Sequence, residues 1–167
     1  MKLFISTVFI LCCLYAFPQK CKFDYEKEDK MTNKMVKRID LKTKYYHHLS
    51  FYNNGEILQI TETIIYRSEQ NEYINEGAKL KIKLNNDSVI ELLSTNVAKP
   101  STFLIGGSVK TKYIIEYTCE KDVFELISKY GFAVFSYQPK GKVPETYELN
   151  KKSAAKSAQS ATCILQD

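Results

Sequence analysis

The sequence predicts a mainly β fold of the α+β type. It should be an antiparallel sandwich or a strongly curved sheet built from hairpins, with one internal helix and a C-terminal helix. Apolar and polar side chains alternate in several short segments, as they do in half-buried strands. Turn-forming residues, above all Asn and Gly, separate these segments at hairpin spacing. Two segments change to the three- and four-residue spacing of a helix. Together these patterns predict about seven to nine strands.

The first residues are typical of a secretory signal. Lys2 precedes an apolar run over residues 3–17 that contains no Asp or Glu, and Pro18 ends the run. We therefore expect a signal over residues 1–19, a single β-rich domain over residues 20–167, and a periplasmic or secreted protein. An uncleaved anchor is the alternative. No later apolar run is long enough to cross a bilayer, so no transmembrane segment is expected after the signal is removed.

Three of the five cysteines lie outside the signal. An oxidising compartment allows disulfides to persist, and three thiols allow one bridge with one thiol left over. We predict that Cys21 pairs with Cys163, which would join the two ends of the domain. Cys119 would then be a small buried thiol. Pairing of Cys21 with Cys119 and three free thiols are the alternatives.

The first half of the domain contains two strand patterns and one long hairpin. Residues 21–25 form a short strand candidate, and residues 35–41 alternate loosely after a polar stretch. Residues 44–67 are rich in aromatic and β-branched side chains, which favour strands. Asn53-Asn54-Gly55 interrupts them, and both residue types tolerate the positive φ angles of a tight turn. Residues 44–67 are therefore predicted to form a hairpin.

Two further hairpins follow. In residues 79–93, leucine and isoleucine alternate with lysine before the turn at Asn85-Asn86-Asp87. In residues 102–118, Gly106-Gly107 supplies two unhindered turn positions. These glycines lack the spacing of a phosphate-binding loop and precede a strand pattern instead of a helix, so a hairpin turn is predicted.

The last third of the chain contains both predicted helices. Residues 120–130 carry apolar side chains at three- and four-residue spacing, and Gly131 fits a helix stop with positive φ. Residues 132–137 and 146–149 return to strand patterns. Residues 151–165 predict a terminal helix with one face of small side chains, which could lie close to a sheet.

Charge and motifs exclude several functions. The net charge of +5 is mild, and lysines alternate with acids, whereas nucleic-acid binders concentrate positive charge. His47 and His48 are adjacent, so in a strand they point to opposite faces and do not share a metal; one surface and one part-buried histidine are expected. Ser153 and Lys156 match the Ser-x-x-Lys nucleophile motif, but a solvated helix face is the expected reading. We expect no catalytic residues, no metal, no cofactor and no nucleic-acid partner.

Tyrosine is unusually frequent, with 12 residues and no Trp. Many lie on predicted strands, where alternation would bury some rings and leave others on the sheet surface: Tyr45, Tyr46, Tyr52, Tyr113, Tyr117 and Tyr137. Surface tyrosines could bind a glycan, a peptide or a protein partner. The simpler interpretation, which we favour, is that aromatic residues are common in strands.

Taken together, the segments resemble a family of small exported β-rich bacterial proteins of unassigned function. The similarity lies in Cys21-Lys22-Phe23-Asp24-Tyr25, in the segment Asp29-Lys30-Met31-Thr32, in the apolar/lysine hairpin over residues 79–93 and in the closing helix over residues 151–163. Met31 stands where that family usually has Phe. The resemblance implies a β-rich exported domain and carries no catalytic residue.

The function predicted from these observations is an exported, non-catalytic domain that binds a protein or glycan partner or a cell-surface component. Two alternatives stay open. One is a small periplasmic hydrolase with a Ser or Cys beside His47 or His48. The other is a barrel that holds an apolar ligand, which the predicted strand number would allow.

Overall fold

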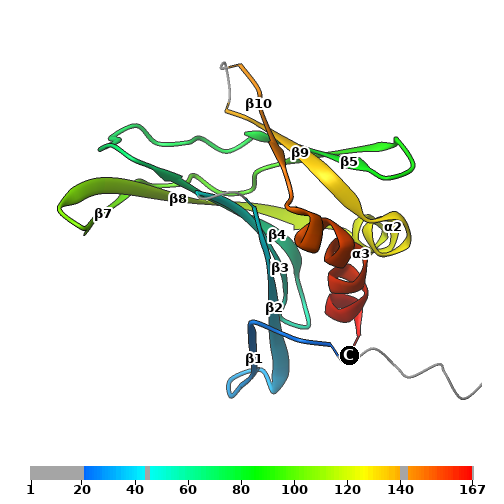
Figure 1. Cartoon of the computed structure of the whole chain (residues 1–167). Coiled ribbons are helices and arrows are strands. Elements are labelled where there is room, and N and C mark those ends of the chain that lie inside the picture. Colours follow the sequence, from blue (N-terminus) through cyan, green and yellow to red (C-terminus); the bar gives the residue numbers. More distant parts are fainter. Residues whose placement is uncertain (1–20, 44–45, 140–142, 167) are drawn as a thin grey trace, which may run out of the picture.

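The computed structural model describes residues 21–43, 46–139 and 143–166, so the predicted signal lies outside the described residues (Figure 1). Two antiparallel sheets and two helices make up the described chain. The larger sheet has six strands and curls, and the smaller has four (Figure 1). The prediction of a mainly β fold with a strongly curved sheet, an internal helix and a C-terminal helix is confirmed.

Each strand of the larger sheet pairs antiparallel with its neighbour. The order across the sheet is β1 (Tyr25–Asp29), β2 (Lys34–Lys42), β3 (His47–Asn53), β4 (Leu58–Tyr66), β8 (Ser108–Cys119) and β7 (Ser101–Ile105). The hairpins predicted over residues 44–67 and 102–118 are therefore present as β3–β4 and β7–β8, although residues 44–45 lie outside the described residues.

The smaller sheet contains the lysine-alternating hairpin and the two strands near the C-terminus. Its order is β10 (Glu145–Glu148), β9 (Phe132–Gln138), β5 (Lys79–Leu84) and β6 (Val89–Leu93). Along β5, every lysine is exposed and every apolar side chain is buried, as the alternation predicts.

The N-terminal strand was predicted too early in the chain. The residues directly after Cys21 precede the strand, and the strand itself is β1, which begins at the last residue of the candidate and extends into the segment expected to be a polar stretch. It is an edge strand, and four of its five side chains are exposed, so hydrophobic patterning gives no sign of it. The described residues form ten strands, one more than the upper limit of the prediction.

The turn between β3 and β4 differs from the expected mechanism. Only Gly55 has a positive φ, of 80°. The asparagines act through their side chains: Asn53 Oδ1 accepts the N–H of Gly55 at 2.7 Å, and Asn54 Oδ1 accepts the N–H of Ile57 at 2.7 Å. The asparagine side-chain oxygens therefore accept the backbone N–H groups of the turn, in the place of backbone carbonyl oxygens.

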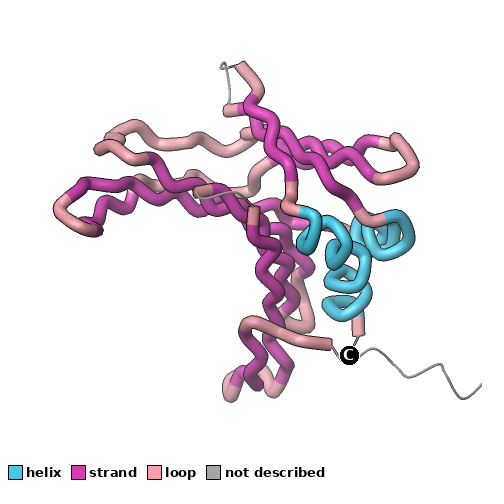
Figure 2. The backbone as a smooth tube through the Cα atoms, in the orientation of Figure 1, coloured by secondary structure: helices cyan, strands magenta, loops and turns pink. Residues whose placement is uncertain are grey.

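Two helices pack together beside the curled sheet (Figure 2). Helix α2 (Lys121–Tyr130) ends at Gly131, whose φ of 64° confirms the predicted stop. Helix α3 (Lys151–Leu165) contacts β2, β3 and β9. Among the described residues, no helix is both long and apolar enough to cross a membrane.

One cluster of apolar side chains joins the inner faces of both sheets to the helices. Its largest fully buried members are Tyr117, Tyr137, Phe51, Phe124, Phe132 and Phe135. This core fills the space between the two sheets and the helices.

The predicted disulfide is present. Cys21 is bonded to Cys163, with their Cα atoms 5.6 Å apart, and so the start of the described chain is tied to the last turns of α3. Cys119 is free and buried, also as predicted. Burial raises the pKa of its thiol to about 12, so the thiolate is scarce near neutral pH.

Candidate functional site

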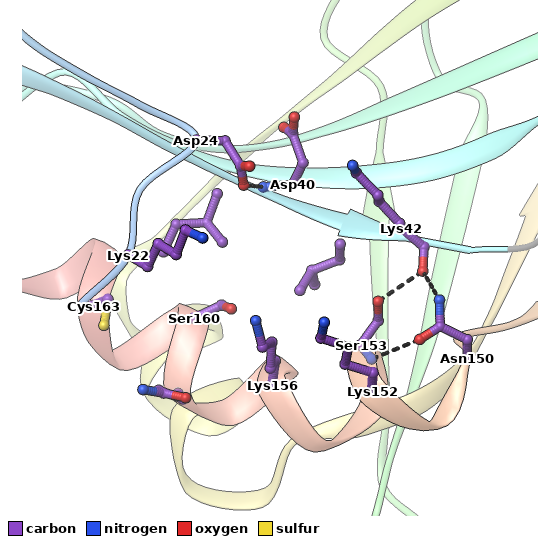
Figure 3. A pocket seen from close by; sticks show the side chains of 13 residues that line it. Lys22, Asp24, Asp40, Lys42, Asn150, Lys152, Ser153, Lys156, Ser160 and Cys163 are labelled. Carbon is purple, nitrogen blue, oxygen red and sulfur yellow. Dashed lines mark hydrogen bonds between the residues drawn. The ribbon is translucent and has the colours of Figure 1, made fainter. Parts of the chain in front are cut away.

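A hollow lies between α3 and the end of β2, and we call it the lysine cleft (Figure 3). Its volume of about 440 Å³ is within the range of small-molecule sites. Four lysines from three parts of the chain line it: Lys22, Lys42, Lys152 and Lys156. The other lining residues are Asp24, Ile39, Asp40, Leu41, Asn150, Ser153, Gln159, Ser160 and Cys163.

Side-chain hydrogen bonds fix the start of α3 to β2 (Figure 3). Asn150 caps the helix by accepting the N–H of Ser153 at 2.9 Å. Asn150 Nδ2 and Ser153 Oγ both donate to the carbonyl oxygen of Lys42, each at 2.7 Å. Lys152 and Lys156 are four residues apart and therefore lie on the same side of the helix, facing the strand.

The disulfide fixes the opposite end of the lysine cleft. Cys163 lines the hollow, and Lys22 directly follows its partner Cys21. The N–H of Asp24 donates to the carbonyl of Arg38 at 2.9 Å, and the Asp24 carboxylate accepts the N–H of Asp40 at 2.8 Å. The N-terminal segment is thus bonded to both β2 and α3, which fixes the backbone that carries Lys22.

The lysine cleft carries excess positive charge. Among the residues that the structure describes, none of its four lysines forms an ion pair. The two acids at the cleft already have partners: the Asp24 carboxylate accepts the Asp40 N–H, and Asp40 Oδ1 lies 3.1 Å from Arg38 Nε. In Figure 3 the ammonium groups of Lys22, Lys152 and Lys156 surround the open space, and Asp40 points away from it.

The helix start adds to this charge. The first turn of α3 contains no acid, although carboxylates stabilise that position by interacting with the helix macrodipole. Lysines stand there instead, so positive side chains meet the positive end of the helix. An anion in the lysine cleft would relieve this repulsion.

The second hollow, which we call the tyrosine pocket, has a volume of about 380 Å³. It forms where β4, β8, β9 and β10 meet the segment over residues 70–75. Four tyrosines line it: Tyr66, Tyr73, Tyr113 and Tyr137. The other lining residues are Gln70, Glu72, Ile74, Asn75, Pro139, Val143 and Glu145.

A buried polar network lies behind the tyrosine pocket. Glu62 is fully buried on β4; its Oε1 lies 2.5 Å from His47 Nε2, and its Oε2 accepts a 2.7 Å hydrogen bond from Tyr117 Oη. The His47 ring contacts the rings of Phe135, Tyr137 and Tyr147. Burial, together with the nearby Glu62 charge, raises the pKa of Tyr117 far above its usual value, so the phenol remains a donor.

This arrangement corrects the expectation for the histidine pair. His47 was expected to be no more than part-buried, but it is only 3% exposed, and His48 is the partly exposed member. The Glu62 carboxylate makes that burial possible, and no sequence spacing connects the two residues. Among the described residues, no cluster of three or more His, Cys, Asp or Glu side chains could hold a metal ion.

The Ser-x-x-Lys pair is divided between two roles. Ser153 is buried and holds the helix start through its bond to Lys42, whereas Lys156 is exposed and lines the lysine cleft. The expected solvated helix face is therefore wrong for Ser153. Gly106 and Gly107 both have positive φ angles in the β7–β8 turn, as the hairpin prediction requires.

Sequence reasoning missed the lysine cleft because its lysines are far apart in the chain. One signal was available: residues 151–165 contain three lysines near the helix start and no acid to balance them. Comparisons of the chain with protein-family models, curated proteins and solved structures find no match.

Proposed function

We propose that this chain is an exported binding domain whose lysine cleft holds an anionic group of a partner or cell-surface component. One observation carries the proposal: the ammonium groups of Lys22, Lys152 and Lys156, which have no acid partner among the described residues, surround a single hollow at the start of a helix (Figure 3). The apparent signal sequence supports export, and the disulfide is compatible with it.

The geometry favours a ligand with several negative charges. Lys22 comes from the strand side of the lysine cleft, and Lys152 and Lys156 come from the helix side. Because these ammonium groups lie on opposite walls, an anion with more than one charged group can reach both (Figure 3). Carboxylate, sulfate and phosphate groups all have the acceptor oxygens that ammonium groups bind. The protein or glycan partner expected from the sequence would carry such groups.

The contacts seen here favour neither alternative function. The hydrolase requires a Ser or Cys beside His47 or His48, and among the described residues neither histidine forms a hydrogen bond with a Ser or Cys side chain. The described contacts of His47 are with Glu62, Phe135, Tyr137 and Tyr147. The barrel requires a large apolar cavity, and charged or amide side chains line much of both described hollows.

Calorimetric titration of the disulfide-bonded protein with citrate, pyrophosphate and a heparin oligosaccharide tests the proposal. We expect these anions to bind and neutral dextran not to bind, with affinity falling as sodium chloride rises. An exposed ion pair contributes up to about 1 kcal/mol, so the variant Lys152→Gln/Lys156→Gln should bind roughly 5- to 30-fold more weakly.

The matched control removes the same charge elsewhere. Lys81 and Lys83 lie on the exposed face of β5, where they pair with Glu91 and Asp87. The variant Lys81→Gln/Lys83→Gln should bind as the parent protein does. Equal weakening in both variants would show a response to net charge alone and would overturn the proposal, as would the absence of binding by every anion.

A further inference from the structure

The tyrosine pocket shares no lining residue with the lysine cleft. Its walls come from both sheets, with Tyr66 and Tyr113 on the larger sheet and Tyr137 and Glu145 on the smaller one. The rings of Tyr66 and Tyr113 meet edge to face, with centroids 5.8 Å apart. The pocket is therefore built by the packing of the two layers.

Tyr137 contributes an unused hydroxyl to this pocket. Its side chain is fully buried, and its Oη has no hydrogen-bond partner among the described residues. Two nearby phenols are already engaged: Tyr113 donates to the carbonyl of Glu72 at 2.7 Å, and Tyr147 donates to the carboxylate of Glu145. Because buried polar groups are almost always hydrogen-bonded, an isolated hydroxyl on a residue that lines the pocket indicates a missing partner.

The hydrogen-bonding capacity of the Tyr137 hydroxyl limits which chemical groups could be its partner. Burial and the Glu62 charge hold the pKa of Tyr137 well above its usual value, so its oxygen carries a proton to donate and lone pairs to accept. An ammonium group only donates, so it would leave the phenol proton unpaired. A carboxylate would be repelled by Glu72 and Glu145, the charged residues among the described lining. A neutral hydroxyl group satisfies the phenol in both directions.

The rest of the lining suits a ligand with several hydroxyl groups. Gln70 and Asn75 carry amides, and Glu145 carries carboxylate oxygens. The Gln70 backbone is fixed, because its N–H donates to Thr111 Oγ1 at 2.9 Å. Tyr66 is partly exposed and Tyr73 is exposed, so aromatic surface is available for the C–H groups of a ring.

We propose that the tyrosine pocket is a second binding site, for a neutral sugar ring that exchanges hydrogen bonds with the Tyr137 hydroxyl. The volume of about 380 Å³ is within the range of small-molecule sites. This site and the anion site use different side chains, so each proposal can fail without the other.

Saturation-transfer NMR on the disulfide-bonded protein tests the site with glucose, galactose, mannose and N-acetylglucosamine, and with choline and glucuronate as charged probes. At least one neutral sugar should receive saturation, and its affinity is then measured by titration. Tyr137→Phe should weaken it about 3- to 10-fold, as expected for one lost hydrogen bond. The melting temperature should not fall, because the hydroxyl has no internal partner to lose.

Two further variants complete the test. Tyr25→Phe removes a hydroxyl from an exposed tyrosine on β1 and should leave sugar binding unchanged. Asn75→Ala changes an exposed lining residue and should weaken binding, which keeps the test decisive even if Tyr137→Phe fails to fold. The proposal is overturned if no neutral sugar binds, if choline or glucuronate binds more tightly than every sugar, or if neither pocket variant weakens binding.

Discussion

Removing the bond between Cys21 and Cys163 should strongly destabilise the protein. The bond joins residues 142 positions apart, so in the unfolded state it closes nearly the whole described chain into a loop. In the chain-entropy model, a loop of this length lowers the entropy of the unfolded chain by about 17 cal/mol/K, which is about 5 kcal/mol at 25 °C. We expect the variant Cys21→Ser/Cys163→Ser to lose between about 3 and 5 kcal/mol of unfolding free energy, since measured losses reach but seldom exceed the model value.

Urea denaturation followed by circular dichroism measures this loss. The slope of free energy against urea should rise as well, because an unfolded chain without the cross-link exposes more surface. Reducing the parent protein with dithiothreitol should give the same midpoint and slope as the double variant. A loss below about 1 kcal/mol with an unchanged slope would refute the reasoning, because it would show that the cross-link does not restrict the unfolded chain.

The same bond bears on function. It ties Lys22 on one wall of the lysine cleft to α3 on the other. If the double variant still folds, its affinity for citrate should therefore fall below that of the parent protein. Unchanged affinity would show that the remaining contacts of the N-terminal segment position Lys22 without the disulfide.

Four other predictions follow from individual side chains. Tyr117→Phe removes a buried hydrogen bond to the Glu62 carboxylate and should lower the unfolding free energy by about 1.5–3 kcal/mol in urea titrations; no loss would contradict the network. Cys119, whose pKa is raised to about 12 by burial, should react with a thiol reagent at pH 8 only after unfolding, and rapid labelling of the native protein would contradict its burial. Burial lowers the pKa of His48 below 6.5, with a further contribution from the neighbouring histidine. In mild acid the unfolded protein therefore binds more protons than the folded protein does. The unfolding free energy that His48 contributes above pH 6.5 is lost as the pH falls through the pKa of His48 in the folded protein. His48→Gln should make the urea midpoint depend less on pH. Gly131→Ala places a Cβ 3.1 Å from two side-chain atoms at a φ of 64°, so the melting temperature should fall with a loss of about 1–3 kcal/mol, whereas an unchanged value would contradict the strain.

Local patterns in the sequence were sufficient for most elements. The alternation of lysine with leucine and isoleucine in residues 79–84 predicts a strand with one exposed and one buried face. In β5 the lysines are exposed and the leucine and isoleucine side chains are buried. The spacing of residues 151–165 predicts α3 with the bounds that the structure shows. These features depend on neighbours a few residues away, so a single sequence contains the information. Strand β1 was misplaced because an exposed edge strand has no apolar face to detect.

Both candidate sites depend on contacts between distant residues. Lys22 and Lys156 line one hollow because a disulfide and a helix cap bring their segments together. The Tyr137 hydroxyl lacks a hydrogen-bond partner among the described residues because of how the two sheets pack, and no local sequence pattern indicates this. The sequence by itself determined the hairpins, the helices and the three thiols available for pairing, since these follow from local periodicity and composition. Only the tertiary structure decided which charges face one another and which polar groups stay unpaired, because both depend on distances across the core that no local spacing encodes.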